Sequence, residues 1–546
     1  MYLTMTKPLF NSYFLFFLIL TAFALSSCKK ESDQPSWDVD ILAPLISSSM
    51  TINNLVSDTL IKINPDSTVN LVYTSSLINY SADSLAQIRD TNLVSGFPIF
   101  SGTFPGGYQI VPLTPTVMNF QVSGVVLKKA ILKTEFINII MSNPIGCTLI
   151  FDYEVPGATL GGIPFRVFDS IPGNTRYSKT FSLAGYSLDL TGPGGTSSNT
   201  MSVSIVAYIS KNVLKYTIPN TTALIDSNRI YNTQAEYVQG YLGQSTKNIG
   251  PQRSAFSLFK SIRSGILNFS KINITLDMDN SVGVDATINL LKISSINTKT
   301  GTTVNLICPS VINNSINVSR ASQTGNPASP VDSTIKSVVI NSSNSNISTQ
   351  FFANLPNQLA YSLQVLVNPL GNISGDNDFI YSGHGINANL QVNIPLSALA
   401  SNLVLADTLL LNLSNSKQIQ KVNSGSLYLY LTNGLPFNAQ VQIYTLNNIN
   451  NKLTITDSLI QTPNNTILSA NMAYIGNLWK VSSSVNSKLA IPLTKSKINN
   501  LVNAKKVIVL ATFNTPAQNN FINIYSYYQL DFKLVADFNY NLSTKN

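Results

Sequence analysis

Residues 427–443, with the sequence LYLYLTNGLPFNAQVQI, decide the fold class of this chain. Apolar and polar side chains alternate on either side of a central Asn-Gly pair, which is the pattern of two half-buried β-strands. Asn and Gly tolerate the positive φ that tight hairpin turns require. The stretch therefore predicts a β-hairpin.

Two earlier stretches have the same order of strand, Asn-containing turn and strand. They are FINIIMSNPIGCTLIF at residues 136–151 and INITLDMDNSVGVDATI at residues 272–288. The three copies lie about 140–150 residues apart, which suits one domain each. We therefore predict the same hairpin in successive β-sandwich domains. The alternative is that Asn-rich turns between strands simply resemble one another.

Most of the remaining chain also has the composition of strands. Short runs rich in Val, Ile, Thr, Tyr and Phe are separated by Asn, Gly, Pro and Ser. Short helices are expected within residues 51–63 and 81–88. The predicted fold class is all-β, with tandem, immunoglobulin-like β-sandwich domains and few short helices. The expected division is a leader (1–27), a tether with the first strand (28–48), an N-terminal β-rich region (49–250), a middle sandwich domain (251–395) and a C-terminal sandwich domain (396–546).

The N-terminal residues have the form of a secretory leader. A cationic start is followed by an apolar run and small residues, so residues 1–27 are predicted to be a signal peptide. Its last residues, Leu25, Ser26 and Ser27, followed by Cys28, resemble the lipobox of bacterial lipoproteins. The resemblance implies that Cys28 becomes the acylated first residue of the mature protein, since several acyl chains anchor a protein stably to a membrane. The alternative is an ordinary secretory leader or a short anchor helix.

Further segments resemble an uncharacterised family of Bacteroidota outer-membrane lipoproteins. These segments are WDVD at residues 37–40, YVQGYLGQ at residues 237–244 and FSLF at residues 256–259. The charged residues KKESD at 29–33 look like the export signal of surface-exposed lipoproteins in the same bacteria. The resemblance covers most of the mature chain and brings no catalytic residues. It implies a lipid anchor in the outer membrane and exposure at the cell surface, with the periplasmic face as the alternative.

Composition limits the classes of function. Of the 546 residues, 44% are hydrophobic and 11% are charged, against about 25% charged residues in ordinary globular chains. The formal net charge is +9, but no stripe of Lys and Arg with interleaved aromatic residues occurs, so nucleic-acid binding is not expected. The excess of cations favours a nonspecific attraction to anionic membranes or polysaccharides.

Residues suited to catalysis are scarce. His384 is the single histidine and is flanked by glycines, so we interpret its segment as a turn rather than as part of a Ser-His-Asp triad. Glu135 and Glu154 bracket the first predicted hairpin, where they could act as paired glycosidase carboxylates, but we interpret them as solvated strand ends. We therefore predict that the chain is not an enzyme and assign no catalytic residue and no cofactor. Cys147 and Cys308 lie in apolar surroundings and are expected to be buried free thiols, with a disulfide as the alternative.

Two groups of aspartates could offer oxygen ligands to calcium. They are Asp277, Asp279 and Asp285 around the second predicted hairpin, and Asp376 with Asp378. Neither group has the spacing of a calcium-binding loop, so we interpret both as polar positions of strands and turns and predict no metal site.

An Asp followed by Ser or Thr recurs along the chain and resembles the O-glycosylation sequon of exported Bacteroidota proteins. A glycan would add bulk and solubility to a surface with few charges. The alternative is that these pairs form turns and caps by hydrogen-bonding their own backbone. The candidate acceptors are Thr59, Ser67, Ser84, Ser170, Ser333, Thr408 and Ser458.

These observations favour a non-catalytic binding or scaffold lipoprotein at the outer membrane, with a protein or glycan partner at the cell surface. The alternative hypothesis is a glycan-binding accessory lipoprotein of a polysaccharide-uptake system, because 23 tyrosines could supply flat faces on which sugars stack. Trp37 and Trp479 are the stronger platforms, although Trp37 has the pattern of a packing residue. A hydrolase with paired carboxylates is the third hypothesis.

Overall fold

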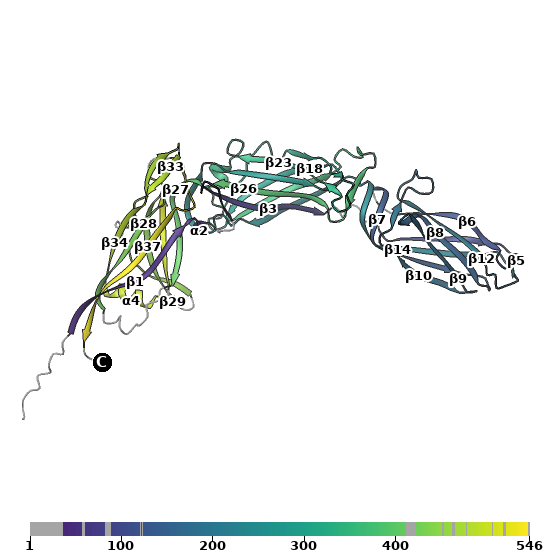
Figure 1. Cartoon of the computed structure of the whole chain (residues 1–546), viewed down its shortest axis with the longest axis horizontal. Helices are drawn as coiled ribbons and strands as arrows, with labels where there is room; N and C mark the ends of the chain where they lie inside the picture. The colour runs from purple at the N-terminus through teal and green to yellow at the C-terminus, as the bar shows by residue number, and fades with distance from the viewer. Residues whose placement is uncertain are drawn as a thin grey trace, which may run out of the picture.

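The computed structural model describes residues 36–56, 60–81, 89–120, 122, 124–410, 422–449, 452–460, 465–476, 478–504, 506–516 and 520–543. These residues form three β-sandwich units placed end to end in a long, bent rod (Figure 1). We call them the base unit (36–56, 262–269 and 396–543), the middle unit (60–81, 242–261 and 270–395) and the distal unit (89–241). The expected all-β fold with few short helices is confirmed.

The base unit consists of two facing sheets. One has the order β1 (Ser36–Thr51), β37 (Gln529–Ser543), β28 (Val422–Asn433) and β34 (Val485–Leu493). The other has the order β16 (Ile262–Phe269), β27 (Ser397–Leu410), β35 (Lys506–Asn514), β29 (Asn438–Ile449) and β30 (Lys452–Ser458). Smaller elements complete the unit: α2 (Ile52–Leu55), β31 (Thr466–Ile467), β32 (Asn471–Ile475), β33 (Leu478–Ser483), α4 (Lys495–Asn503) and β36 (Ile522–Asn523). The helix expected over residues 51–63 is limited to α2, and the one expected over 81–88 lies mostly outside the described residues.

The middle unit is a second sandwich. One sheet has the order β2 (Ile61–Ile63), β3 (Val69–Ser81), β26 (Gly385–Pro395), β17 (Asn273–Asn280) and β23 (Thr334–Asn341). The other has the order β15 (Ser245–Ala255), β24 (Gln358–Val367), β18 (Ala286–Asn297) and β19 (Thr302–Asn305), with β20 (Ser315–Val318) also on β18. The short ribbon of β21 (Ser322–Gln323) with β22 (Val331–Asp332), and the π-helix η3 (Ile347–Phe351), complete it. Buried and partly exposed residues alternate along β17 and β24, so each strand turns one face to the core.

The distal unit is built on one large sheet that folds over itself. Its main path is β25 (Asp378–Tyr381), β14 (Thr222–Tyr241), β7 (Val126–Ser142), β11 (Ser187–Asp189), β8 (Leu149–Leu160), β12 (Thr200–Ile209) and β6 (Gln109–Asn119). Three strands pair beside this path: β4 (Thr91–Ile99), β9 (Ile163–Ile171) and β10 (Arg176–Ser182). A ribbon of β5 (Gly102–Pro105) and β13 (Lys215–Ile218) forms the far end (Figure 1). The strand β25 belongs in sequence to the middle unit, so it joins the two units.

The units are nested in the sequence rather than consecutive. Strand β1 pairs with β37 from Ser36↔Ser543 to Thr51↔Gln529, and β3 pairs with β26. The chain therefore leaves the base unit after β1, builds part of the middle unit, completes the distal unit and then returns. The sequence-based division places its boundaries at residues 48, 250 and 395. Both strand pairings cross these boundaries. Periodicity identifies a strand, but it does not identify a distant pairing partner.

The predicted hairpins at 136–151, 272–288 and 427–443 are wrong in their connection. In the middle unit β17 pairs with β23 and β26, whereas β18 pairs with β24 in the opposite sheet. In the base unit β28 and β29 likewise belong to opposite sheets, and in the distal unit β7 and β8 are separated by β11. Each stretch is therefore an arch that crosses the sandwich. Buried and exposed residues alternate in the same way along a strand of either sheet, so the sequence could not distinguish an arch from a hairpin.

A buried asparagine at the equivalent position stabilises each of the three arches. The side-chain amides of Asn143, Asn280 and Asn433 donate to the carbonyl four residues later, at 2.9, 2.8 and 3.0 Å. Each side-chain oxygen accepts the N–H two residues later, and each amide also reaches a carbonyl of a distant loop. None of the three has a positive φ. The recurrence is therefore confirmed, but the asparagine is needed for hydrogen bonds to the turn backbone rather than for a left-handed conformation.

Candidate functional site between the middle and distal units

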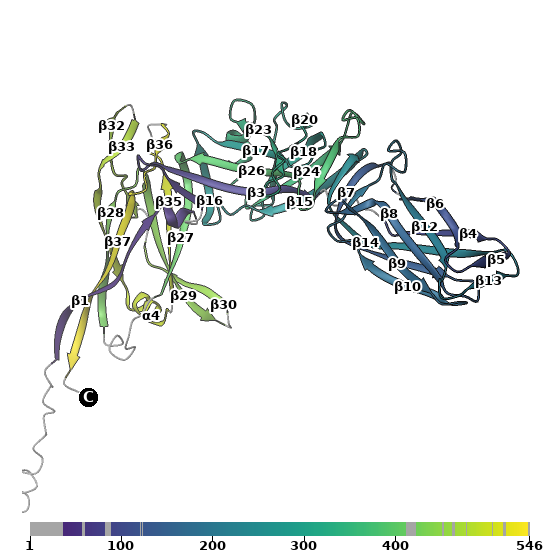
Figure 2. The same cartoon turned by 45° about the vertical axis from the view of Figure 1, so that its right-hand side comes forward.

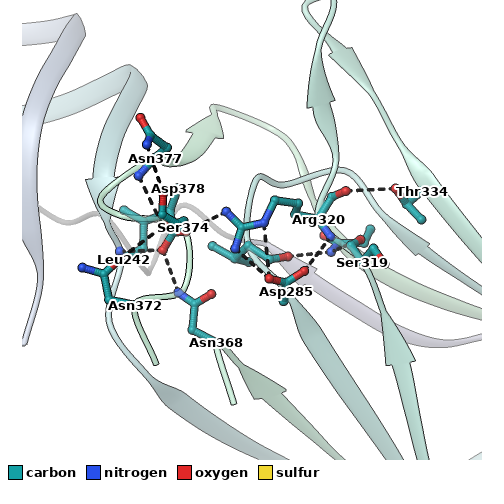
Figure 3. A network of polar contacts seen from close by, with 12 residues as sticks. Leu242, Asp285, Ser319, Arg320, Thr334, Asn368, Asn372, Ser374, Asn377 and Asp378 are labelled. Atoms are coloured by element: carbon teal, nitrogen blue, oxygen red, sulfur yellow. Dashed lines mark hydrogen bonds and ion pairs between the residues drawn. The ribbon is translucent and has the colours of Figure 1, made fainter. Parts of the chain in front are cut away.

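Arg320 lies between two carboxylates where the middle unit meets the distal unit (Figure 3). Its guanidinium donates to Asp285 Oδ2 from Nη2 at 2.7 Å and from Nε at 3.3 Å. Its Nη1 donates to Asp378 Oδ1 at 3.3 Å, and the Asp378 side chain is only 1% exposed. Removing one partner of such a shielded pair would leave an unpaired charge in a poorly solvated place.

Asp378 also holds the chain that returns from the distal unit. Its Oδ2 accepts the N–H of Leu242, directly after β14, at 3.1 Å. The same oxygen accepts the side-chain amide of Asn368 at 2.7 Å, and that amide also donates to Gly243 O at 3.1 Å. One carboxylate thus fixes the linking segment and the arginine at once.

Strand pairing and aromatic packing strengthen this junction. Strand β25 adds to the end of β14, with Tyr237 opposite Tyr381, and their rings lie 4.7 Å apart between centroids. Phe379 of β25 packs over Gly283 in the arch of the middle unit. A Cβ at Gly283 would lie 2.2 Å from the Phe379 ring, so only glycine permits this approach.

An ion pair closes the other side of the junction. Lys128 Nζ of β7 lies 3.0 Å from Asp376 Oδ2 in the loop before β25. The hydrogen bond from Lys128, supported by one from Asn372, lowers the pKa of the Asp376 carboxyl below its ordinary value. The carboxylates at the junction are therefore engaged by donors, which is the chemistry of a structural connection rather than of a general acid or base.

The junction contains three of the aspartates considered as calcium ligands, and one of them, Asp376, is paired with Lys128. Asp285 and Asp378 are brought together, but the Arg320 guanidinium occupies the space between them, where a cation would sit. Asp277 and Asp279 lie on β17, opposite Ser337 and Ile335 of β23. Within the described ranges, no three His, Cys, Asp or Glu side chains gather in a metal-binding group.

The remaining catalytic candidates do not form a site. His384 lies in the turn before β26, where its N–H donates to Tyr381 O and its ring packs edge-on against the Tyr381 ring. Glu154 is half-buried on β8 near Arg166. Glu135 contradicts the expectation of a solvated strand end, because it is fully buried in the distal unit.

Burial of Glu135 has a clear electrostatic consequence. Neither of its carboxylate oxygens has a partner with hydrogen-bond geometry among the described residues. Burial raises the pKa of Glu135 to about 8, and the neighbouring Thr233 hydroxyl acts weakly in the opposite direction. Glu135 is buried because it lies on the inward face of β7, as Ile137 does two residues later. A register shift against β14 separates Glu135 from Leu132, the preceding residue on that face.

Asp226 forms a second buried acidic position in the same unit, and the sequence analysis missed it. Burial raises its pKa to about 7, although the Asn228 amide donates to it at 2.5 Å. The signal was present in the sequence, because Leu224, Asp226, Asn228 and Ile230 occupy alternate positions of β14 and therefore share its buried face.

The structure places five of the seven candidate glycosylation sites. Ser170, Ser333 and Thr408 are exposed, and Ser67 and Ser458 are half-buried, whereas Thr59 and Ser84 lie outside the described residues. The alternative turn geometry is visible at several of them. Asp66 accepts from Thr68, and Asp169 and Asp457 each accept the N–H of the next residue. Glycosylation stays a prediction.

The expected state of the cysteines is confirmed for two of the three. Cys147 and Cys308 are buried free thiols. Cys28 and the lipobox residues Leu25, Ser26 and Ser27 lie outside the described residues, so acylation stays a prediction. Within the described part of the chain, no helix has the length and apolar character needed to cross a membrane.

Comparison of the sequence with protein-family models and with curated proteins finds no match. Among solved structures, the chain is similar to a protein of Parabacteroides distasonis proposed to be secreted, with 10% identity over 92% of this chain and 99% of that one and a TM-score of 0.32. It is also similar to a protein of the cowpea mosaic virus particle, with 10% identity over 59% of this chain and 91% of that one and a TM-score of 0.16. Both TM-scores lie well below 0.5, so neither likeness bears on what this chain does.

Proposed function

We propose that this chain is a non-catalytic, lipid-anchored binding or scaffold protein that holds its distal unit away from the outer membrane. The observation that carries the proposal is the pairing of β1 with β37, because it puts both ends of the described chain in the base unit (Figure 2). The predicted anchor, Cys28, precedes β1 by only a few residues. An anchored base therefore leaves the distal unit at the far end of the rod.

The surface of the distal unit supports a role in contact with a partner. Leu214, at the turn before β13, is 96% exposed, and Phe168 and Phe100 are 68% and 65% exposed. Single exposed apolar side chains are normal on a protein surface, so these residues offer contact area to a partner without requiring one. The partner could be a protein or a glycan.

Site-directed labelling tests the arrangement. The full lipidated protein is placed in vesicles whose headgroups carry a quencher, and a fluorophore is attached to Leu214→Cys in the distal unit or to Leu42→Cys in the base unit. Both native residues are exposed, and the buried Cys147 and Cys308 should not react. We expect strong quenching at position 42 and none at position 214. Equal quenching at both positions would show that the rod lies flat on the membrane and would refute the proposal.

One observation favours glycan binding as a second candidate function. Trp479, in the β32–β33 ribbon, is half-buried and lines a cleft of about 360 Å³ together with Asn438, Asn471 and Asn520. A flat aromatic face beside amide groups is suited to a neutral sugar. Binding to a panel of neutral oligosaccharides that is lost in Trp479→Ala but kept in Trp479→Phe would support this function. No binding by the unmodified protein would exclude it for that panel.

A further inference from the structure

A basic cleft lies where the base unit meets the middle unit. It encloses about 800 Å³. The base unit supplies Met50, Asn53, Arg263, Leu405 and Asp407, and the segment between β15 and β16 supplies Ser257, Lys260 and Ser261. The cationic lining residues are Lys260, Arg263 and Lys299.

Buried aromatic rings fix the segment that carries Lys260 and leads to Arg263 at the start of β16. Phe256 and Phe259 are buried, and their ring centroids lie 5.8 Å apart. Between and after them, Ser257, Lys260 and Ser261 are exposed. The Lys260 N–H donates to Ser257 O at 3.2 Å, which closes a tight turn. The cleft wall is therefore held by the core rather than by a free loop.

Lys299 is fixed from the opposite side. It lies in the turn between β18 and β19, where the Asn297 side chain accepts the N–H of Lys299 at 3.0 Å and that of Thr300 at 3.2 Å. Its Nζ donates to Ile262 O at 2.8 Å, which brings the ammonium group to the wall that carries Arg263. An ammonium group has three donors, so two remain for a ligand.

The charges of this cleft are not balanced. Asp407 is the one carboxylate among the described residues that line it. Within the described residues, neither Lys260 nor Arg263 forms an ion pair. Three cations facing one acid in a partly enclosed space attract an anion, because the protein walls weaken solvent screening.

We propose that this cleft binds a segment of an acidic oligosaccharide. Lys and Arg pair with carboxylate or sulfate groups, and Ser257, Ser261 and Asn53 offer hydrogen bonds to sugar hydroxyls. Met50 and Leu405 supply an apolar surface for a ring face. A single inorganic anion would fill a small part of about 800 Å³. No aromatic ring lines the cleft among the described residues, which disfavours stacked nucleic-acid bases. This inference is independent of the display role and of the cleft beside Trp479.

Calorimetric titration of the full detergent-solubilised protein tests the proposal. The probes are tetrasaccharides of polygalacturonate, polymannuronate and heparin, with maltotetraose as the neutral probe and inorganic phosphate as the free anion. We expect at least one acidic tetrasaccharide to bind, and to bind more weakly as salt is raised. Lys260→Glu with Arg263→Glu should weaken that binding at least tenfold. Both residues are exposed, so the variant should fold.

A matched control separates a site from general attraction. Lys211→Glu with Lys215→Glu changes the net charge by the same amount at exposed positions of the distal unit, and it should leave binding unchanged. The proposal is overturned if no acidic probe binds, if maltotetraose binds equally well, or if phosphate alone competes at the same concentration. Equal weakening in both charge variants would also overturn it. Trp479→Ala should not affect the acidic probes, so the two glycan hypotheses fail separately.

Discussion

Replacing Glu135 by Gln should stabilise the distal unit at neutral and alkaline pH. The Glu135 carboxyl is fully buried, and its oxygens have no hydrogen-bond partner among the described residues. Burial raises its pKa from 4.5 to about 8. Glutamine has nearly the same shape and no charge, so the variant keeps the packing and removes the titration.

The size and sign of the effect follow from proton binding. The folded protein keeps the Glu135 proton up to about pH 8, whereas the unfolded chain loses it near pH 4.5. The free energy of unfolding should therefore be highest below pH 4.5 and should fall as the pH rises to about 8. At about 1.4 kcal/mol per pH unit, the loss over this window is on the order of 5 kcal/mol. Asp226 acts in the same direction, but its window ends near pH 7.

Scanning calorimetry of the full chain at pH 5, 7 and 8 provides the assay. The transition that changes in Glu135→Gln belongs to the distal unit. Between pH 7 and 8 the free energy of unfolding of the distal unit should fall by about 1 kcal/mol in the unmodified protein, so its transition should move to lower temperature. In the variant the transition should stay constant. The free energy of unfolding of Glu135→Gln combined with Asp226→Asn should be nearly independent of pH from 5 to 8, and the variant His384→Gln, in a half-buried turn, serves as a control. Two results would refute the reasoning. One is an unmodified protein that is equally stable at pH 5 and pH 8. The other is a Glu135→Gln variant whose stability still falls between pH 7 and 8 as in the unmodified protein.

Three further substitutions test the arches and the junction. Asn280→Ala removes two buried hydrogen bonds and one partly buried hydrogen bond of about 1 kcal/mol each. Urea unfolding should therefore show a loss of about 3 kcal/mol in the free energy of unfolding, whereas Asn448→Ala at an exposed position should show almost none. Arg320→Leu leaves the Asp378 carboxylate buried without its cation. The variant should lose about 3 kcal/mol in the free energy of unfolding and show a wider distribution of rod lengths in small-angle scattering. The control Lys179→Leu, which breaks an exposed ion pair, should change neither quantity. Gly283→Ala puts a methyl group against the Phe379 ring and should speed proteolysis at residues 241–245. Adding Phe379→Ala should partly restore protection, and unchanged proteolysis in Gly283→Ala would contradict the close packing.

The sequence predicted the strands and their recurrence but not their connection. The Asn of each repeated stretch and the alternating residues around it identified three equivalent units, as the shared hydrogen bonds of Asn143, Asn280 and Asn433 bear out. Alternation states that a strand buries one face, but it does not state in which sheet that strand lies. The arch was therefore mistaken for a hairpin, and the pairing of β1 with β37 left no local signal.

The junction was predictable only in part for a similar reason. Asp285 and Asp378 were singled out by their oxygen atoms, but their partner Arg320 lies 35 and 58 residues away along the chain. Nothing in the spacing of the three residues points to an ion pair. The buried Glu135 and Asp226 could have been recognised from the alternation of their strands, since each occupies an inward position.

Nesting gives the rod a mechanical property that tandem domains lack. Consecutive domains share one linker and move freely unless their interface is large. Here the chain passes between the base and middle units after α2, between β15 and β16, between β16 and β17, and between β26 and β27. Between the middle and distal units it passes after β3 and after β14, where β25, Arg320 and Lys128 add strand pairing and ion pairs. A bend at either junction must therefore deform several segments at once, so nesting favours a nearly fixed distance between the distal unit and the base, which the proposed display above a membrane would require.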